Sequence, residues 1–320
     1  MTLRTLSLEH TPDQQLWDTL VRVSAQRNPY VTPAYARAFK EAFGYEIEII
    51  GLFQDEHLIG GALLYIERKG PYRRVLIPPF TQYTSVLFEE PLSTARIHAH
   101  TSPLDQVLSY IEDRYASLQI ALHPSLLDIR PFQWHHWDVL PRYTYQMPLK
   151  DRERMLRDWS AGTRRLFLKH EEEFEIVEAP WASREIIELA RKSYQRHECP
   201  FPADADRLDV AVRHLLDTHF ARAFVAKRGE TLEAGLIVLH DRKTAYYWIA
   251  GSLPGPGMTV LLGSVLPRLY AETMDRFDFV GANTPSIAEF KRRFGPKLRL
   301  YFITTRINRP ELRVLASLKG

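Results

Sequence analysis

Five basic side chains lie close together in the segment AEFKRRFGPKLRLYF, at residues 288–302: Lys291, Arg292, Arg293, Lys297 and Arg299. When an amine attacks an ester or thioester carbonyl, an oxyanion forms, and a fixed cation stabilises it where water is excluded. Lysine suits this task because its charge is compact and burial can lower its pKa. The segment is therefore a solvated basic turn, a nucleic-acid patch or the anion-handling part of an active site.

Further candidate side chains lie in the same half of the chain. Asp278 stands between two phenylalanines in a strand pattern and so faces away from them. It either orients a loop or substrate amine, or caps the turn before Gly281. Arg164 and Arg165 either bind a phosphate or carboxylate in a bidentate manner or form a solvated helix face. Tyr247 belongs to a run of three aromatics, which lines a substrate cleft or packs partly into the core.

The composition is that of an ordinary globular protein. The chain has 320 residues, of which 45% are apolar and 25% charged, and its net charge is +3. This length favours two domains of roughly 150 residues each. The mild positive charge permits an anionic partner without requiring one. The single cysteine, Cys199, excludes a disulfide framework and a thiolate metal cluster, and the sequence has neither a zinc signature nor a Walker loop. We expect no metal.

The N-terminal segment MTLRTLSLEHTPDQQ has no apolar run of signal-peptide length. No apolar stretch approaches the roughly 20 residues that span a bilayer. We therefore expect a cytoplasmic protein, which would reach an envelope component from the cytoplasmic side.

The first half of the chain shows both helix and strand patterns. Residues 46–69 predict two strands around an Asp55–Glu56 turn. Ser102 and Pro103 begin the clearest helix, with Ser102 as a plausible N-cap. Its apolar residues form one stripe at helical spacing, namely Leu104, Val107, Leu108, Ile111, Tyr115 and Leu118. A charged stretch starts near Lys150, so we place the domains at 1–150 and 151–320.

The second half repeats the plan of the first. Residues 224–251 and 51–77 each show a strand, a charged turn, a glycine-containing strand, a charged turn and a third strand. Gly61 and Gly235 occupy matching places. A repeat of this size indicates two copies of one fold rather than a solenoid. We expect Gly295 to end the short helix before the last strand.

The order of elements in the second half resembles the GNAT acyltransferase fold. In that family a glycine loop opens a helix and holds the pyrophosphate of acyl-coenzyme A on backbone N–H groups. Here the loop is SLPGPG, in which Gly255 and Gly257 match and Ser252 does not. Pro256 also removes one N–H donor. The alternative interpretation is a plain turn before a helix.

The segment FDFVGANTPSIAEFKRRFG resembles the closing segment of the FemAB-like branch of the GNAT superfamily. The matching residues are Phe277, Asp278, Phe279, Gly281, Phe290, Lys291, Phe294 and Gly295. NPYVTPAYARAF and the basic segment WSAGTRRLFLKHEEE are similar to other parts of that branch. The resemblance implies a mixed α+β fold of two tandem GNAT-like domains, each a largely antiparallel sheet flanked by helices. It also implies that Phe290 and Lys291 lie at the active site.

The resemblance further implies an acyltransferase acting on an amine of a small molecule or an envelope precursor. The donor is either acyl-coenzyme A or aminoacyl-tRNA, and Lys291 stabilises the oxyanion or a donor phosphate. A second hypothesis is a non-catalytic protein that binds an anionic envelope precursor. Nucleic-acid binding as a sole function fits least, because the sequence has no extended basic and aromatic array. The final strand packs across the domain interface in this scheme, and the protein is a monomer or a dimer.

Overall fold

The computed structural model describes residues 1–89, 102–196, 198–309 and 311. The chain forms two compact units. Unit 1 contains Met1–Arg142 and Leu300–Gly320, and unit 2 contains Tyr143–Arg299. The units divide after Arg142 and after Arg299, whereas the sequence prediction set a single division after residue 150. The chain passes from one unit to the other within β7 (Asp138–Pro148) and again within β13 (Lys297–Ile307).

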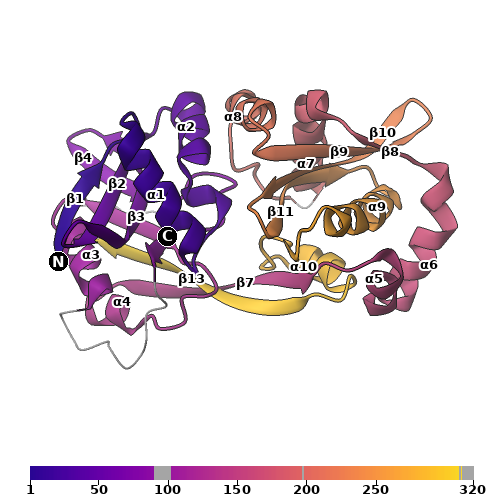
Figure 1. Ribbon diagram of the computed structural model, residues 1–320. Helices are drawn as coiled ribbons and strands as arrows, with labels where there is room; N and C mark the ends of the chain where they lie inside the picture. The colour runs from indigo at the N-terminus through magenta and orange to yellow at the C-terminus, as the bar shows by residue number, and fades with distance from the viewer. Residues whose placement is uncertain (90–101, 197, 310, 312–320) are drawn as a thin grey trace. The chain divides into compact units, whose positions relative to one another are not determined.

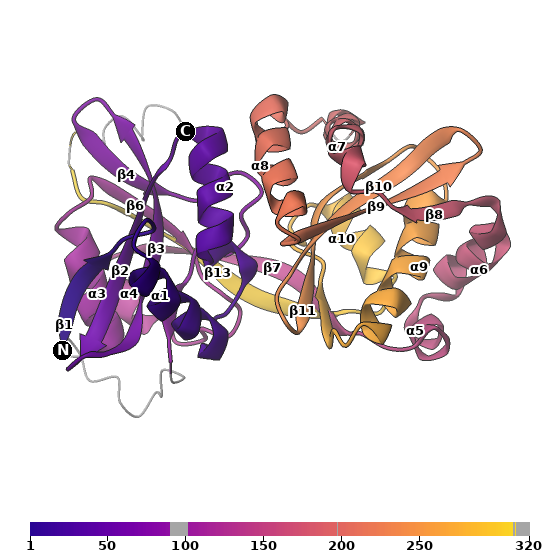
Figure 2. The same ribbon diagram turned by 45° about the horizontal axis from the view of Figure 1, so that its top comes forward.

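Unit 1 is a mixed sheet with helices. Its sheet has the order β1-β2-β3-β4-β6-β13, and β5 pairs with β3. The contacts are antiparallel except for the parallel β4–β6 pair. Its strands are β1 (Thr2–Leu6), β2 (Glu46–Gln54), β3 (His57–Lys69), β4 (Tyr72–Leu76), β5 (Val86–Phe88) and β6 (Ser117–Ala121). Its helices are α1 (Thr11–Val23), α2 (Pro33–Phe43), α3 (Pro103–Glu112) and α4 (Arg130–Trp134), which Figure 2 shows around these strands.

The local sequence pattern predicted the start of helix α3 correctly but not its end. Ser102 and Asp105 form a capping box, and Pro103 is the first helical residue, as predicted. The predicted apolar stripe is too long, because the helix ends at Glu112 and Leu118 lies in β6. The Arg114 N–H donates to the Ile111 carbonyl, so the last turn tightens and the helix stops. Tyr115 and Leu118 are nonetheless buried in the same core.

Unit 2 is also a mixed sheet, with the order β7-β12-β11-β10-β9-β8. Only the β11–β12 pair is parallel among the strand pairs of this unit that the structure describes. Its further strands are β8 (Glu175–Glu178), β9 (Ala221–Arg228), β10 (Thr231–His240), β11 (Thr244–Ser252) and β12 (Arg276–Asp278). Its helices are α5 (Arg152–Asp158), α6 (Ala161–His170), α7 (Ser183–Arg196), α8 (Ala205–Asp217), α9 (Gly257–Ala271) and α10 (Pro285–Arg292).

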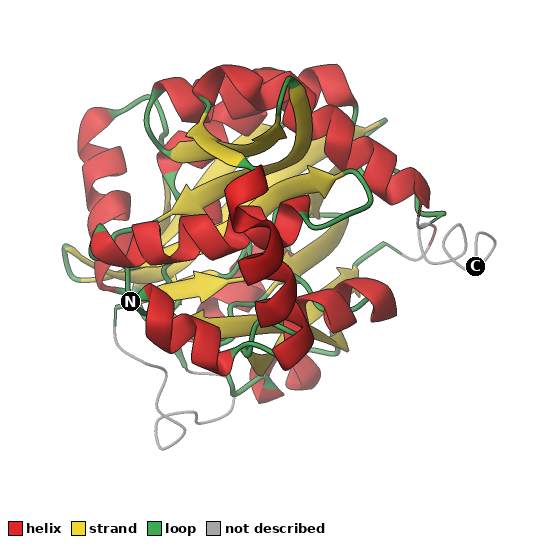
Figure 3. Ribbon diagram, turned by 90° about the vertical axis from the view of Figure 1, so that its right-hand side faces the viewer, coloured by secondary structure: helices red, strands yellow, loops and turns green. Residues whose placement is uncertain are grey.

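Helices cover both faces of the unit 2 sheet. Helices α7 and α8 lie on one side of β9–β11 and α9 lies on the other (Figure 1). Figure 3 shows red helices on either side of the yellow strands. A Cβ on Gly251 of β11 would lie 2.1 Å from the Ala190 backbone nitrogen of α7. A Cβ on Gly235 of β10 would lie 2.5 Å from Ile186 of the same helix. These glycines therefore let α7 approach the sheet at van der Waals distance.

The internal repeat corresponds to two similar hairpins. In unit 1, β2 pairs with β3, and in unit 2, β9 pairs with β10, both antiparallel. Gly61 and Gly235 lie within the second strand of each hairpin, where a side chain would collide with packed atoms. The predicted α+β class with two copies of one fold is therefore confirmed.

The close approach of α7 gives a test of packing. Gly251→Ala forces a methyl group into the α7 backbone, so we expect the free energy of unfolding to fall by about 1–3 kcal/mol. Gly162→Ala in α6 is the matched control, because nothing lies within 4 Å of its Cβ position. Alanine's higher helix propensity should raise stability there by up to about 1 kcal/mol. Urea unfolding measures both, and equal effects of the two changes would contradict the packing argument.

Candidate active site in unit 2

Strands β11 and β12 part after a short parallel ladder. Their pairing ends at Tyr246 and Asp278, although β11 continues to Ser252. Beyond Asp278 the chain stays with β7, since the Phe279 N–H donates to the Tyr145 carbonyl at 2.8 Å. From Tyr247 onward, β11 therefore has an edge that no residue of β12 pairs with. Such an edge offers backbone donors and acceptors to a ligand.

A β-bulge falls at the same place. The β10–β11 register shifts between Ile237 and Val238, so Trp248 is the extra residue of β11. Bulges re-aim neighbouring side chains. Tyr246 and Trp248 are both buried, and Tyr247 is partly buried. The run of three aromatics thus contributes to the core, and Tyr247 lies at the point where β11 and β12 part.

Lys291 of α10 is buried, with 5% of its surface exposed. Its Nζ donates to three successive carbonyls: Phe279 at 2.6 Å, Val280 at 2.7 Å and Gly281 at 2.8 Å. Val280 and Gly281 have φ angles of 50° and 78°, in the left-handed region. This conformation curls the three carbonyls around one point. Lys291 is therefore not part of a solvated basic turn.

The contacts of Lys291 match the charged form of its amine. An ammonium has three N–H donors and finds three acceptors here, whereas a neutral amine has only two donors. Burial lowers the pKa of Lys291 to about 7, and the nearby Asp278 carboxylate acts in the opposite direction. The Nζ also lies 5.1 Å from the centroid of the Tyr247 ring, within the range of a cation–π contact.

Asp278 is fully buried and hydrogen-bonded. Its Oδ1 accepts from Thr144 Oγ1 at 2.6 Å and from the Val280 N–H at 2.8 Å, and its Oδ2 accepts from Gln146 Nε2 at 2.8 Å. The carboxylate therefore caps the turn and also lies near the Lys291 charge. Thr144 and Gln146 alternate on β7 and were not among the residues singled out from the sequence. In the sequence, these two residues are indicated only by being polar and two positions apart, and so on one face of a strand.

Phe290 belongs to an aromatic cluster beside Lys291. Its ring centroid lies 5.1 Å from that of Phe294. Phe294 in turn lies 5.7 Å from Phe279 and 4.8 Å from Trp159. The side of the site next to the Phe279 carbonyl is therefore apolar.

The remaining predicted residues occupy other places in unit 2. Gly255 lies in the turn that leads from β11 into α9 and has a φ of 140°, and Gly257 is the first residue of α9. Arg164 is half-buried and donates to the Leu156 carbonyl at 3.4 Å, and Arg165 is exposed. The structure thus brings Lys291, Asp278 and Tyr247 together, with Phe290 next to them. The two arginines make no described contact with this group.

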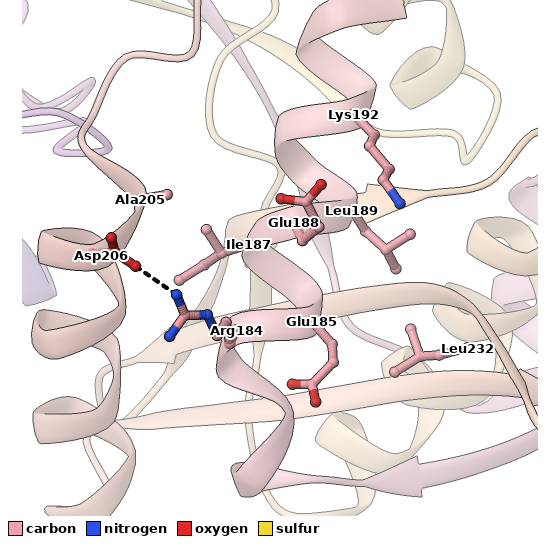
Figure 4. Close-up of a pocket in the computed structure, with 9 residues that line it drawn as sticks. All are labelled: Arg184, Glu185, Ile187, Glu188, Leu189, Lys192, Ala205, Asp206 and Leu232. Carbon is pink, nitrogen blue, oxygen red and sulfur yellow. Dashed lines mark hydrogen bonds and ion pairs between the residues drawn. The ribbon is translucent and has the colours of Figure 1, made fainter.

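A separate surface pocket of about 490 Å³ lies over α7 (Figure 4). None of the predicted site residues lines it. Arg184 forms an ion pair with Asp206 at 2.7 Å, and Glu188 pairs with Arg191 at 2.9 Å. Three of its charged lining residues, Arg184, Glu188 and Asp206, are thus exposed members of ion pairs, and we do not include the pocket in the candidate site.

Within the described ranges, no three His, Cys, Asp or Glu side chains are arranged to hold a metal ion. Over the same residues, no helix combines the length and apolar character needed to cross a bilayer.

The lowered pKa of Lys291 predicts a pH-dependent stability. Below about pH 7 its amine is protonated in both folded and unfolded chains, whereas above that pH the folded chain loses the proton first. The unfolded state then binds more protons. The free energy of unfolding of the wild type should therefore rise with pH relative to Lys291→Met, by up to about 1.4 kcal/mol per pH unit.

Urea unfolding of both proteins between about pH 6 and pH 9 measures this difference. The control is Lys297→Met, because Lys297 is exposed, and its difference from the wild type should stay constant over the same range. A constant difference for Lys291→Met as well would show that burial does not perturb this amine.

Comparison with known proteins places this geometry in a known fold. Residues 154–292 match the acetyltransferase (GNAT) domain family. The structure of FemX is similar over 94% of this chain and 97% of its own, with a TM-score of 0.70 and 13% identity. A tandem GNAT protein from the clavulanic acid biosynthesis pathway covers 97% of this chain and 99% of its own, with a TM-score of 0.59 and 13% identity.

The C-terminal domain of a putative lysylphosphatidylglycerol synthetase from Agrobacterium fabrum has a TM-score of 0.56 and 13% identity, over 98% of this chain and 96% of its own. The search of curated proteins found no match. The predicted resemblance is confirmed at the level of the fold: residues 154–292 match the GNAT domain family, and the chain has a tandem GNAT fold similar to that of FemX.

Proposed function

We propose that this chain is an N-acyltransferase and that transfer takes place in unit 2, where β11 and β12 part. The observation that carries the proposal is the buried Lys291 ammonium beside Tyr247, where the pairing of β11 with β12 has ended. A GNAT domain over residues 154–292 supports the acyltransferase class. The fold alone does not assign a substrate.

The reaction has one bond-forming and one bond-breaking event. The nitrogen of a neutral amine attacks the carbonyl carbon of an ester or thioester donor, and an oxyanion forms. The C–N bond is retained, the C–O or C–S bond breaks, and the leaving oxygen or sulfur takes up the proton released by the amine. A separate general base is unnecessary if the amine arrives neutral.

In this proposal Lys291 acts mainly through its fixed position and charge. Its three N–H donors are occupied by carbonyls, so it does not exchange a proton with substrate in this arrangement. Its positive charge stabilises an oxyanion nearby because the site is buried and weakly screened. Asp278 holds the turn that presents the carbonyls, and Tyr247 and Phe290 line the apolar side.

The acyl or aminoacyl donor is either acyl-coenzyme A or aminoacyl-tRNA. Gly255 and Gly257 would contact a coenzyme donor, and Arg164 and Arg165 would contact donor phosphates. The acceptor is an amine of a small molecule or an envelope precursor. The similarity of this fold to the C-terminal domain of a putative lysylphosphatidylglycerol synthetase supports aminoacyl chemistry of this kind.

Lys291→Met should lower kcat/KM for transfer by roughly 100-fold or more, because a preorganised charge is lost from the site. Arg292→Met is the matched control. Arg292 is the next residue of α10, is exposed and pairs with Glu289, so its loss should change the rate less than about twofold. Circular dichroism and melting temperature check that both variants fold.

The assay supplies radiolabelled acetyl-coenzyme A or aminoacyl-tRNA with a panel of amines and follows label in the amide product. Equal activity of Lys291→Met and wild type would remove Lys291 from the mechanism. If the wild type transferred from neither donor yet bound an envelope precursor tightly, the protein would be a binding protein on this scaffold.

A further inference from the structure

A second β-bulge aims a carboxylate at the glycine turn before α9. The β9–β10 register shifts between Leu232 and Ala234, so Glu233 is the extra residue of β10. Successive side chains of a regular strand point to opposite faces, but at a bulge they can share one. Glu233 and Ala234 both do so here: the Cβ position of Gly257 lies 3.3 Å from Glu233 Cβ and 3.4 Å from Ala234 Cβ.

The two oxygens of Glu233 have different neighbours. Oε1 forms an ion pair with Arg228 Nε at 3.1 Å, and Oε2 lies 3.9 Å from the Cβ position of Gly255. The backbone is tied to the turn as well, since the Leu253 N–H donates to the Glu233 carbonyl at 2.7 Å. With 17% of the side chain exposed, the carboxylate is held against the turn rather than free in solvent.

An anion at the start of α9 would bind the backbone N–H groups of the first turn of this helix. Pro256 supplies no N–H, and no side chain caps this end of the helix. A carboxylate beside a helix N-terminus is itself favoured by the helix dipole. It also repels a second anion beside Gly255, because its partner Arg228 lies on the other oxygen. The guanidinium of Arg196 lies at the start of the turn instead, where it donates to the Ser252 carbonyl at 2.6 Å.

We propose that Glu233 is a specificity-determining residue that keeps pyrophosphate away from the start of α9. The donor is then not a coenzyme A thioester but an ester whose phosphates lie elsewhere, the chemistry of an aminoacyl-tRNA. The conclusion about the donor rests on the proposed acyltransferase function. The carboxylate's effect on coenzyme binding can be measured without any transfer.

The experiment titrates coenzyme A into the wild type, Glu233→Gln and Glu230→Gln by isothermal calorimetry. Glutamine keeps the size of the side chain and removes its charge. We expect Glu233→Gln to bind coenzyme A at least about tenfold more tightly than the wild type, since a like charge near the site is removed. Glu230 lies exposed in the β9–β10 turn, so Glu230→Gln makes the same charge change and should not alter binding.

Unchanged affinity of Glu233→Gln, or tight coenzyme A binding by the wild type, would overturn the inference. An equal gain in Glu230→Gln would also overturn it, because the effect would then reflect net charge alone. Transfer from acetyl-coenzyme A by the wild type would overturn the inference and leave the acyltransferase proposal standing. Transfer from neither donor would remove the proposed function, and the calorimetry would still decide the role of Glu233.

Discussion

The burial of one ammonium group constrains the whole candidate site. A charge removed from water is costly unless hydrogen bonds replace its solvent, and Lys291 replaces it with three carbonyls from one turn. Three successive carbonyls converge only if the backbone curls, which Val280 and Gly281 achieve with positive φ angles. The position of α10, which carries Lys291, and the path of the chain after β12 are therefore fixed together.

This constraint also explains why β12 is short and why its pairing with β11 ends at Tyr246. The turn begins directly after Asp278, whose carboxylate binds Val280 and two side chains of β7. The chain is thereby held on β7 while β11 runs on to Ser252. A fully paired β11 could offer its backbone to no ligand. The parting of the strands and the buried charge are thus two results of one local structure.

The sequence predicted the fold better than the site. Paired hairpins, a capped helix at Ser102 and tandem copies follow from local patterns and from a family resemblance. Lys291 and Asp278 were identified by the same resemblance, but their contacts were not. Thr144 and Gln146 lie more than a hundred residues before Asp278 in the chain, and only strand pairing brings them close. Glu233 was missed because a register shift, rather than residue type, decides which way it points.

The edge of β11 beyond its pairing with β12 has different charged groups at its two ends. At Tyr247 it meets the Lys291 ammonium, and after Ser252 it leads into a turn beside the Glu233 carboxylate. A donor lying along this edge would meet the Lys291 ammonium at one end and, beyond Ser252, the Glu233 carboxylate beside Gly255. Acyl transfer builds negative charge on the carbonyl oxygen, so the reacting carbonyl is favoured near Lys291. The same polarity disfavours a donor whose anionic group must lie at the glycine turn, and the two bulges of the β9–β11 sheet set that polarity.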